Sequence, residues 1–149
     1  MTKIHRISVD SKQKSSEAIL MQKKLKSLGY DVEIVAVSRV YTTDYDFSDD
    51  QIVKISNALH NNLVHSVRID SGFKKEFTFA LELGFLPGVT DNVANTTTEI
   101  INDLFKINIG LSKVFSTKVV FIKSTSLKEE DIKSIANELI NLLIERFHI

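Results

Sequence analysis

A segment that recurs eighty residues later is the feature that most constrains the fold of this chain. Residues 48–69 (SDDQIVKISNALHNNLVHSVRI) align without gaps with residues 128–149 (KEEDIKSIANELINLLIERFHI), and seven of the twenty-two pairs are identical. The identical pairs are Ile52/Ile132, Ile55/Ile135, Asn57/Asn137, Leu59/Leu139, Asn61/Asn141, Leu63/Leu143 and Ile69/Ile149. Similarity at a fixed internal spacing is typical of a duplicated structural unit. The sequence therefore predicts two copies of one small fold.

The length of the chain favours one domain that contains both copies. A chain of 149 residues with 43% hydrophobic residues can bury roughly 70% of its unfolded surface, which is enough for one ordinary core. Two independent domains would each have a small core. We therefore expect a single compact domain over residues 1–149, made of a first copy (1–72) and a second copy (73–149).

Charge and composition exclude several classes of function. The chain has 19 basic and 19 acidic side chains, so its charge balance indicates neither a nucleic-acid nor a membrane partner, although low net charge eases formation of a homo-oligomer. It has no cysteine, which removes disulfides, thiolate catalysis and cysteine metal sites. No apolar run approaches the ~20 residues of a membrane span, and the amino terminus lacks the apolar region of a signal peptide. We therefore expect a cytoplasmic protein.

The first copy is expected to have the order β-α-β-α-β. Its predicted elements are a strand at Ile7 and Val9, a helix over residues 15–28, a strand over residues 32–41, a helix after residue 48, and a strand at Val67 and Ile69. The predicted apolar stripe of the first helix is Ile19, Leu20, Leu25 and Leu28, with Gly29 ending the helix. Ser48 and Gln51 have the spacing of a capping box, which indicates where the second helix begins.

The second copy repeats this order. Its predicted elements are a strand over residues 77–85, a helix capped by the sequence Thr96-Thr97-Thr98-Glu99, a strand over residues 114–122, a helix bearing Ile132, Ile135 and Leu139, and a closing strand at Phe147 and Ile149. Amphipathic helices of this length between strands indicate an α+β fold, with helices on one face of a mainly antiparallel sheet. The opposite sheet faces of the two copies could then meet in a shared core.

The loop between the first strand and first helix of the second copy is the most distinctive local sequence. It consists of Leu86, Pro87, Gly88, Val89, Thr90, Asp91 and Asn92. Pro-Gly makes a sharp turn, and Asp91 can accept from backbone amides where the next helix starts. The same amides could receive a phosphate or carboxylate from a ligand or partner. The first copy has DSKQKSS here, so the two copies are not equivalent at this loop.

Residues 77–149 resemble a known family. The stretch FALELGFLPGVTDN, followed by a helix, a long strand, a second helix and a short terminal strand, resembles the small PurS subunit of phosphoribosylformylglycinamidine synthase. Two such units in tandem resemble the amino-terminal PurS-like domain of the single-chain enzyme, where one fused domain is similar to a dimer of the small subunit. The first copy matches only by its pattern and lacks the Pro-Gly-Val turn.

The resemblance implies a non-catalytic role in purine biosynthesis. In that family a synthetase region uses ATP and magnesium, a glutaminase region hydrolyses glutamine, and the PurS-like part bridges the two. Free ammonia is mostly protonated in neutral water, so its transfer between sites favours an enclosed route assembled by docked surfaces. The resemblance therefore implies that this chain binds no cofactor itself, and that the loop from Leu86 to Asn92 contacts the synthetase region.

Two other classes of function stay open. A duplicated regulatory module would bind a small metabolite at a concave polar site between its copies. A small enzyme would need a constellation of scattered residues such as Asp91, Asn92 and His148, and no spacing in the sequence indicates one. The histidines, at positions 5, 60, 65 and 148, lack short metal-ligand spacing, which favours surface roles over a metal site.

Overall fold

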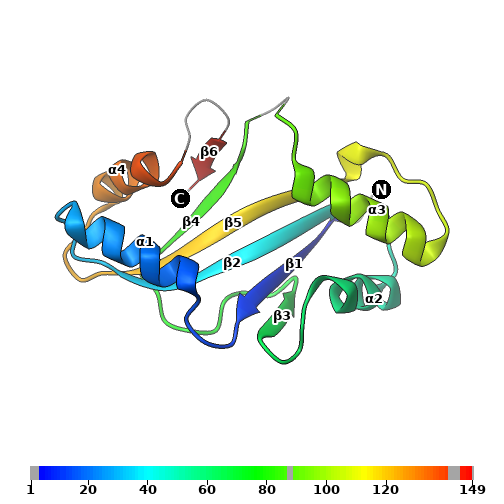
Figure 1. Ribbon diagram of the computed structural model, residues 1–149, viewed down its shortest axis with the longest axis horizontal. Coiled ribbons are helices and arrows are strands. Elements are labelled where there is room, and N and C mark those ends of the chain that lie inside the picture. Colours follow the sequence, from blue (N-terminus) through cyan, green and yellow to red (C-terminus); the bar gives the residue numbers. More distant parts are fainter. Residues whose placement is uncertain (1–3, 87–88, 141–144, 149) are drawn as a thin grey trace.

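The fold is a six-stranded antiparallel sheet with α-helices on one face, as Figure 1 shows for the computed structural model, which describes residues 4–86, 89–140 and 145–148. The strands are β1 (Ile4–Ser11), β2 (Glu33–Asp44), β3 (His65–Ile69), β4 (Phe79–Phe85), β5 (Val114–Lys123) and β6 (Glu145–His148). The helices are α1 (Ser16–Ser27), α2 (Asp49–Leu59), α3 (Asn92–Phe105) and α4 (Glu129–Leu139), with a 3-10 turn η1 (Leu111–Lys113) before β5. The predicted α+β class is confirmed.

The strand order is the same when read outward in either direction from the middle of the sheet. The order is β3-β1-β2-β5-β4-β6, so β2, β1 and β3 on one side correspond to β5, β4 and β6 on the other. The pairing register corresponds as well. Ser8 lies opposite both Val40 and Arg68, and Glu82 lies opposite both Val119 and His148. The two halves therefore have one topology and are related by an approximate twofold axis.

The axis passes through the pairing of β2 with β5, where Arg39 lies opposite Lys118. This pairing runs from Glu33 opposite Lys123 to Thr43 opposite Val114. The halves join edge to edge, so the expectation that their sheet faces would meet in a shared core is wrong. Each half alone would leave a long strand edge unpaired, and the edge-to-edge pairing satisfies those backbone groups.

The recurring segments adopt matching structures. Helix α4 begins and ends eighty residues after α2, and the residues that follow them, His60 and Ile140, are both extended, at φ −137° and ψ 162° and at φ −109° and ψ 158°. In each helix the two repeated isoleucines are buried: Ile52 and Ile55 in α2, and Ile132 and Ile135 in α4. This correspondence supports the proposal that the halves arose by duplication of one unit.

Side-chain hydrogen bonds cap the first turns of both α2 and α4. Gln51 N donates to Ser48 Oγ at 3.2 Å and Ser48 N donates to Gln51 Oε1 at 2.9 Å, so the predicted capping box at α2 is confirmed. At α4, Lys128 N donates to Asp131 Oδ2 at 2.9 Å. Both helices thus satisfy backbone donors that a helix start would otherwise leave without partners.

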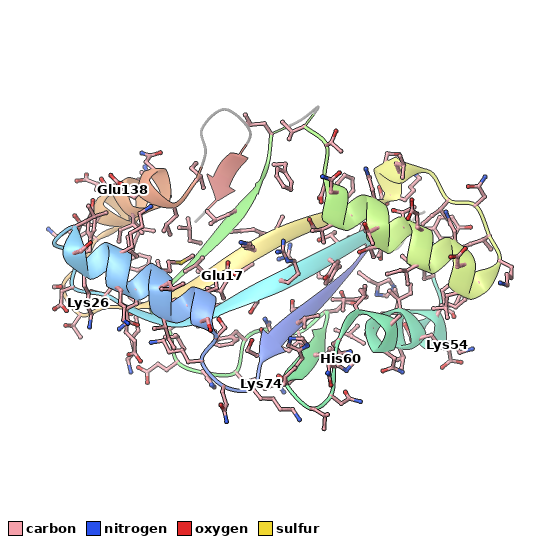
Figure 2. All side chains as sticks on the ribbon, viewed as in Figure 1. Glu17, Lys26, Lys54, His60, Lys74 and Glu138 are labelled. Carbon is pink, nitrogen blue, oxygen red and sulfur yellow. The ribbon has the colours of Figure 1, made fainter. Side chains whose placement is uncertain are left out.

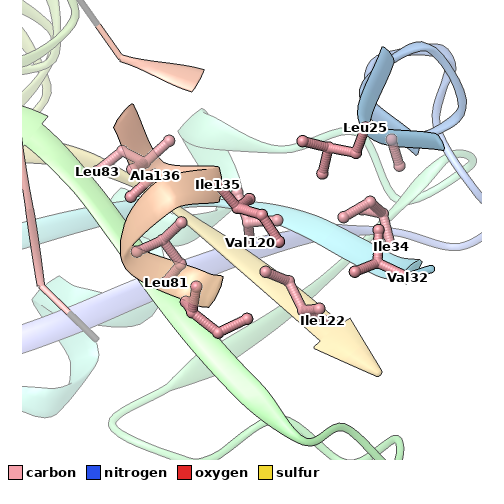
Figure 3. Packing of buried hydrophobic residues seen from close by; sticks show 11 residues of the cluster. Leu25, Val32, Ile34, Leu81, Leu83, Val120, Ile122, Ile135 and Ala136 are labelled. Atoms are coloured by element: carbon pink, nitrogen blue, oxygen red, sulfur yellow. The ribbon is translucent and has the colours of Figure 1, made fainter. Parts of the chain in front are cut away.

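Each of the two main core clusters combines residues from both halves. One cluster lies between α1 of the first half and α4 of the second, over strands β2, β4 and β5 (Figure 3). The other lies between α2 of the first half and α3 of the second, over β1 and β5. Lys24 Nζ of α1 also donates to the backbone oxygen of Glu138 in α4 at 2.8 Å. Neither half can bury its own helices fully, which favours one cooperative unit.

The predicted buried face of α1 is wrong in part. In α1 the buried residues are Ala18 and Leu25, whereas Ile19, Leu20 and Leu28 are 41%, 65% and 49% exposed. The helix docks through its small Ala18 face, which lets its backbone approach the sheet.

Helix α3 begins at Asn92 rather than at the predicted threonine box. Asp91 is its N-cap, and Ala94 N donates to Asp91 Oδ1 at 2.9 Å. Thr97 and Thr98 lie inside the helix, where their hydroxyls donate to the carbonyls of Val93 and Ala94, four residues earlier. Serine and threonine make such bonds when they lie within a helix rather than at its start.

Because the two halves share one core, a substitution that creates a cavity in either half should destabilise the same unfolding transition. Ile55→Ala and Ile135→Ala should each lower the free energy of unfolding by about 2–5 kcal/mol, because both side chains are fully buried. Urea unfolding followed by circular dichroism and by fluorescence of a dye that binds apolar surface measures this. Val53→Ala in α2, where the side chain is 48% exposed, is the matched control and should cost less than about 1 kcal/mol. Two separate transitions would contradict the single shared core.

Candidate functional site on the open face of the sheet

The sheet face opposite the helices is crossed by the connection between β3 and β4. Asp70 starts this connection in the left-handed backbone region, at φ 53°, which aspartate tolerates better than most residues. Its carboxylate accepts from Arg6 N at 2.7 Å and lies 2.7 Å from His5 Nδ1. These contacts fix the turn that sends residues 71–78 across the open face.

A buried ion pair lies beneath this connection. Arg68 on β3 donates to both carboxylate oxygens of Asp10 on β1, from Nε at 2.7 Å and from Nη2 at 3.1 Å. The Ser38 hydroxyl of β2 donates to the same carboxylate, and Arg68 Nη1 donates to the backbone oxygen of Ser71 at 3.0 Å. The paired side chains are only 11% and 10% exposed. All three guanidinium nitrogens of Arg68 therefore donate hydrogen bonds, and the bond to Ser71 holds the connection against the sheet.

Aromatic rings complete this arrangement. Phe73 stacks on Phe121 with ring centroids 4.0 Å apart and planes 9° apart, and Phe77 meets Phe121 edge-on at 4.9 Å. The Arg68 guanidinium lies 5.3 Å from the Phe73 ring centroid and 5.7 Å from that of Phe121. Stacked aromatic pairs and cations over ring faces are both favourable. This cluster forms a rigid wall on the open face.

Two cavities share the wall formed by Arg68 and Phe73. The interhalf cavity has a volume of about 560 Å³, and its lining comes from both halves and the connection: Arg6, Ser8, Val40, Arg68, Asp70, Ser71, Gly72, Phe73, Phe77, Ala80, Glu82, Val119 and Phe121. The β1–α1 cavity has a volume of about 440 Å³ and is lined by residues 10–15, 35–37, 66–68 and 73–75. Both volumes are in the range of small-molecule sites.

The interhalf cavity has a mainly apolar lining that also carries charged groups of both signs. Arg6 and Arg68 are matched by Asp70 and Glu82 in its lining. Arg6 Nη2 lies 3.2 Å from Glu82 Oε2, which also accepts from the Thr117 hydroxyl at 2.6 Å. This pair joins β1 of the first half to β4 of the second. The cavity thus lies at the concave junction of the halves.

The loop predicted to bind a partner lies away from both cavities. Pro87 and Gly88 lie outside the described residues. Leu86 and Val89 are half-buried, and Val89 N donates to Leu86 O at 3.1 Å. Thr90 and Asn92 are exposed. The described part of the loop therefore offers a small polar surface just before α3.

Asp91 in this loop is occupied by internal hydrogen bonds. Besides capping α3, it accepts from Ser116 N at 2.8 Å and from the Ser116 hydroxyl at 2.7 Å. The predicted cap is confirmed. Its carboxylate ties α3 to β5, so replacing it would test folding as much as binding.

Of the four histidines, His5 differs from the surface role predicted for it, whereas His60 and His65 are partly exposed. His5 is only 3% exposed, and its Nε2 has no hydrogen-bond partner among the described residues. His60 lies beside Ser56 O and Asn62, and His65 accepts from Asn61 N at 3.1 Å. The side chain of His148 lies outside the described residues. In the part of the chain that the structure describes, no three histidine or acidic side chains are grouped to hold a metal ion.

A smaller cavity of about 220 Å³ lies on the helix face near the twofold axis. Its lining includes Arg39, Tyr41 and Lys118, and Lys118 pairs with Glu17 of α1 at 2.7 Å. Burial raises the pKa of the Tyr41 phenol, and the nearby Arg39 charge opposes that rise. Tyr41 therefore lines this cavity as an uncharged phenol at neutral pH.

Comparisons with known proteins give no family for this chain. No protein-family model matches it, and no curated protein matches it. Within residues 4–86, 89–140 and 145–148, no helix has the length and apolar character needed to cross a lipid bilayer. Function is therefore argued from the residues and their geometry.

The open-face cluster has only a partial signal in the sequence. Arg6, Ser8 and Asp10 alternate with apolar residues along β1, and this alternation predicts a polar sheet face. The partners Arg68, Phe73 and Phe121 are distant in sequence, so the pattern could not identify them. The cluster depends on tertiary contacts.

The buried pair predicts a large loss of stability when the arginine is removed. Arg68→Met should lower the free energy of unfolding by about 3–5 kcal/mol, because it leaves the Asp10 carboxylate buried without its counter-charge. Adding Asp10→Asn should recover part of this loss. Arg6→Met is the matched control, since the Arg6–Glu82 pair on the same face is 45% and 27% exposed, and should cost at most about 1 kcal/mol. Urea unfolding measures all three, and equal losses at both arginines would contradict the burial argument.

Proposed function

We propose that this chain is a PurS-like, non-catalytic bridging domain of a phosphoribosylformylglycinamidine synthase. In this role it helps to couple a glutaminase region to a synthetase region for ammonia transfer. The cofactors of the reaction, ATP, magnesium and glutamine, are used by those other regions. The proposal rests on the resemblance of residues 77–149 to the small PurS subunit and on the symmetry of the fold.

The observation that carries the proposal is the repeated strand order about β2 and β5. A fused pair of small subunits should consist of two units with one topology, and the order β3-β1-β2-β5-β4-β6 has this property. The helices correspond in the same way. Helix α1 packs with α4 over one part of the sheet, and α3, its equivalent in the second half, packs with α2 over the equivalent part. A body of this kind presents two related ends, which suits a bridge between partners.

The two ends differ in chemistry, and this difference suits two different partners. The second half has the loop at residues 86–92, where Asp91 is bound to Ala94 and Ser116. The first half has DSKQKSS between β1 and α1, with Ser15 as the N-cap of α1. Figure 1 shows the two connections on opposite sides of the sheet. We assign the synthetase contact to the 86–92 end, through exposed Thr90 and Asn92.

Co-purification tests the proposal directly. The tagged chain should recover the synthetase and glutaminase regions of the purine enzyme from a lysate of its source cells, as identified by mass spectrometry. Thr90→Lys should reduce recovery of the synthetase region about tenfold, which corresponds to a loss of ~1.4 kcal/mol in binding, because it places a long charged side chain at the contact. Isolated chain should have no turnover.

A matched variant separates binding from folding in this experiment. Thr96→Lys makes the same change at an exposed position of α3 outside the loop, and should leave recovery unchanged. Melting temperatures of both variants should equal that of the parent chain. Failure to recover either named region, or equal losses in the two variants, would count against the bridging role.

The interhalf cavity favours one second candidate, a module that binds a small metabolite. The regulatory alternative predicted a concave polar site between the copies. The cavity lined by Arg6, Phe77 and Glu82 lies between the copies and carries charged groups of both signs, although most of its lining is apolar. Its balanced charges and phenylalanine rings would suit a zwitterion with an aromatic group.

Thermal unfolding distinguishes this second candidate. L-Phenylalanine at a concentration well above its Kd should raise the melting temperature, because a ligand that binds only the native state stabilises it by RT ln(1 + [L]/Kd). Ala80→Leu fills the cavity from β4 and should abolish the shift. Val53→Ala on the helix side should retain it. No shift with the parent chain would leave bridging as the better account.

A further inference from the structure

The β1–α1 cavity differs from the interhalf cavity in the charge of its lining. Lys12 and Lys14 come from the connection between β1 and α1, and Lys74 and Lys75 come from the connection between β3 and β4. The acidic residue in the lining is Asp10, and its charge is balanced by Arg68. Four lysines therefore give the rim a formal charge of +4 in a chain whose net charge is zero.

The nearby carboxylates are paired elsewhere. Glu76, next to Lys75, lies 3.9 Å from Lys123, and Glu17 of α1 lies 2.7 Å from Lys118. Within the described residues, no ion pair joins the four rim lysines to a carboxylate. Arg68 already has its charge paired with Asp10, and its Nη1 donates to Ser71 O. The positive charge available to a ligand is thus that of the lysines.

One of these lysines is held in position. Lys14 Nζ donates to Gln22 Oε1 at 2.6 Å, and the same oxygen accepts from Ile34 N at 2.9 Å. Gln22 thereby ties the rim to the start of β2. Ser15 at the mouth caps α1, accepting from Ala18 N at 3.2 Å. The rim on this side is therefore built on a strand and a helix, which reduces the ordering that binding would require.

The floor of the cavity is apolar because β2 has a register shift. The pairing with β5 is irregular between Ile34 and Ala36. As a result Val35 and Ala36, although consecutive, both pack with the open-face cluster, together with Phe73. A bulge of this kind redirects side chains at the edge of a regular ladder. It gives the cavity a flat apolar base beside the Phe73 ring.

We propose that the β1–α1 cavity binds a small organic phosphate, with the phosphate at the lysine rim and an apolar, planar group on the floor of Val35, Ala36 and Phe73. Lysines bind phosphate as mobile point charges, and hydroxyls of Ser11, Ser15 and Ser66 in the lining can donate to it. An apolar base with a few polar groups at the mouth is the usual composition of a ligand site. A nucleic-acid track is less suitable, because the lysines surround one concavity.

The connection between β1 and α1, which supplies Lys12 and Lys14 to this site, has no chemical equivalent in the second half. The equivalent connection in the second half is the 86–92 loop, which contains no lysine and whose Asp91 is bound to Ser116. The same place in the fold therefore has different chemistry in each half. The inference does not rest on the bridging role, since the ligand site and the partner contact are separate surfaces.

Titration with 1-naphthyl phosphate tests the inference, because this probe has both a planar apolar group and a phosphate. Its fluorescence, with amide NMR shifts of Ser15, Ala36 and Ser66, should report saturable one-to-one binding that weakens as salt rises. 1-Naphthol lacks the phosphate and inorganic phosphate lacks the planar group. Each should bind at least about tenfold more weakly than the probe, because the loss of ~1.4 kcal/mol of binding free energy is enough for a tenfold change.

Charge-matched variants decide whether the four lysines act as a site. Changing Lys12, Lys14, Lys74 and Lys75 together to Gln should weaken binding of the probe at least about fivefold, because each exposed pair with the anion contributes a factor of roughly 1.5 to 5. The control changes Lys26, Lys54, Lys128 and Lys133 to Gln, which alters the net charge equally; Figure 2 shows Lys26 and Lys54 far from Lys74. The control should bind as the parent chain does.

Three outcomes would overturn the inference. Equal weakening in the two quadruple variants would mean non-specific attraction, and equal binding of 1-naphthol would mean an apolar cavity without an anion site. Absence of saturable binding to the parent chain would also reject it. Circular dichroism and melting temperature verify that each variant is folded. Recovery of the synthetase region is measured separately, so failure here leaves the bridging proposal intact.

Discussion

The pairing of β2 with β5 is the interaction on which the rest of this structure depends. It extends from Glu33 opposite Lys123 to Thr43 opposite Val114, and it is the only ladder that joins the two halves among the described strands. Without it, each half would have an unpaired long edge and helices lacking the apolar contacts that the other half supplies. Because the ladder aligns the halves side by side, α1 reaches α4 and α2 reaches α3. Secondary structure and core therefore form together.

The same edge-to-edge arrangement leaves one sheet face without helices. On that face the chain uses its own connection between β3 and β4, held by Asp70 and Arg68, to cover part of the central strands. The cover is incomplete, and a cavity lies on either side of Phe73. Burying Asp10 with Arg68 costs desolvation, which the bidentate contact and the Ser71 bond offset. The ion pair thus specifies where the connection lies.

Much of the fold follows from local sequence signals, and the remainder depends on long-range packing. Ser48 with Gln51, and the isoleucines at positions 52 and 55, define α2 because capping and 3.6-residue periodicity are local. In α1 the predicted burial of Leu25 is confirmed and that of Leu20 is wrong, since apolar residues extend round the helix and contact with the sheet buries Ala18 instead. The burial of His5 and the Arg68–Asp10 pair were missed for the same reason: their partners lie some sixty residues away.

Approximate symmetry with unequal loops gives this fold its functional potential. A symmetric body offers the same contact twice, and that would bind two copies of one partner. Here the equivalent connections differ: one contains lysines around a cavity and the other fixes Asp91 against Ser116. Both are anchored to the same pair of central strands, since Gln22 binds the backbone at Ile34 of β2 and Asp91 binds Ser116 of β5. The shared core can therefore stay constant while each end changes its binding chemistry independently, which is the property a bridge between unlike partners requires.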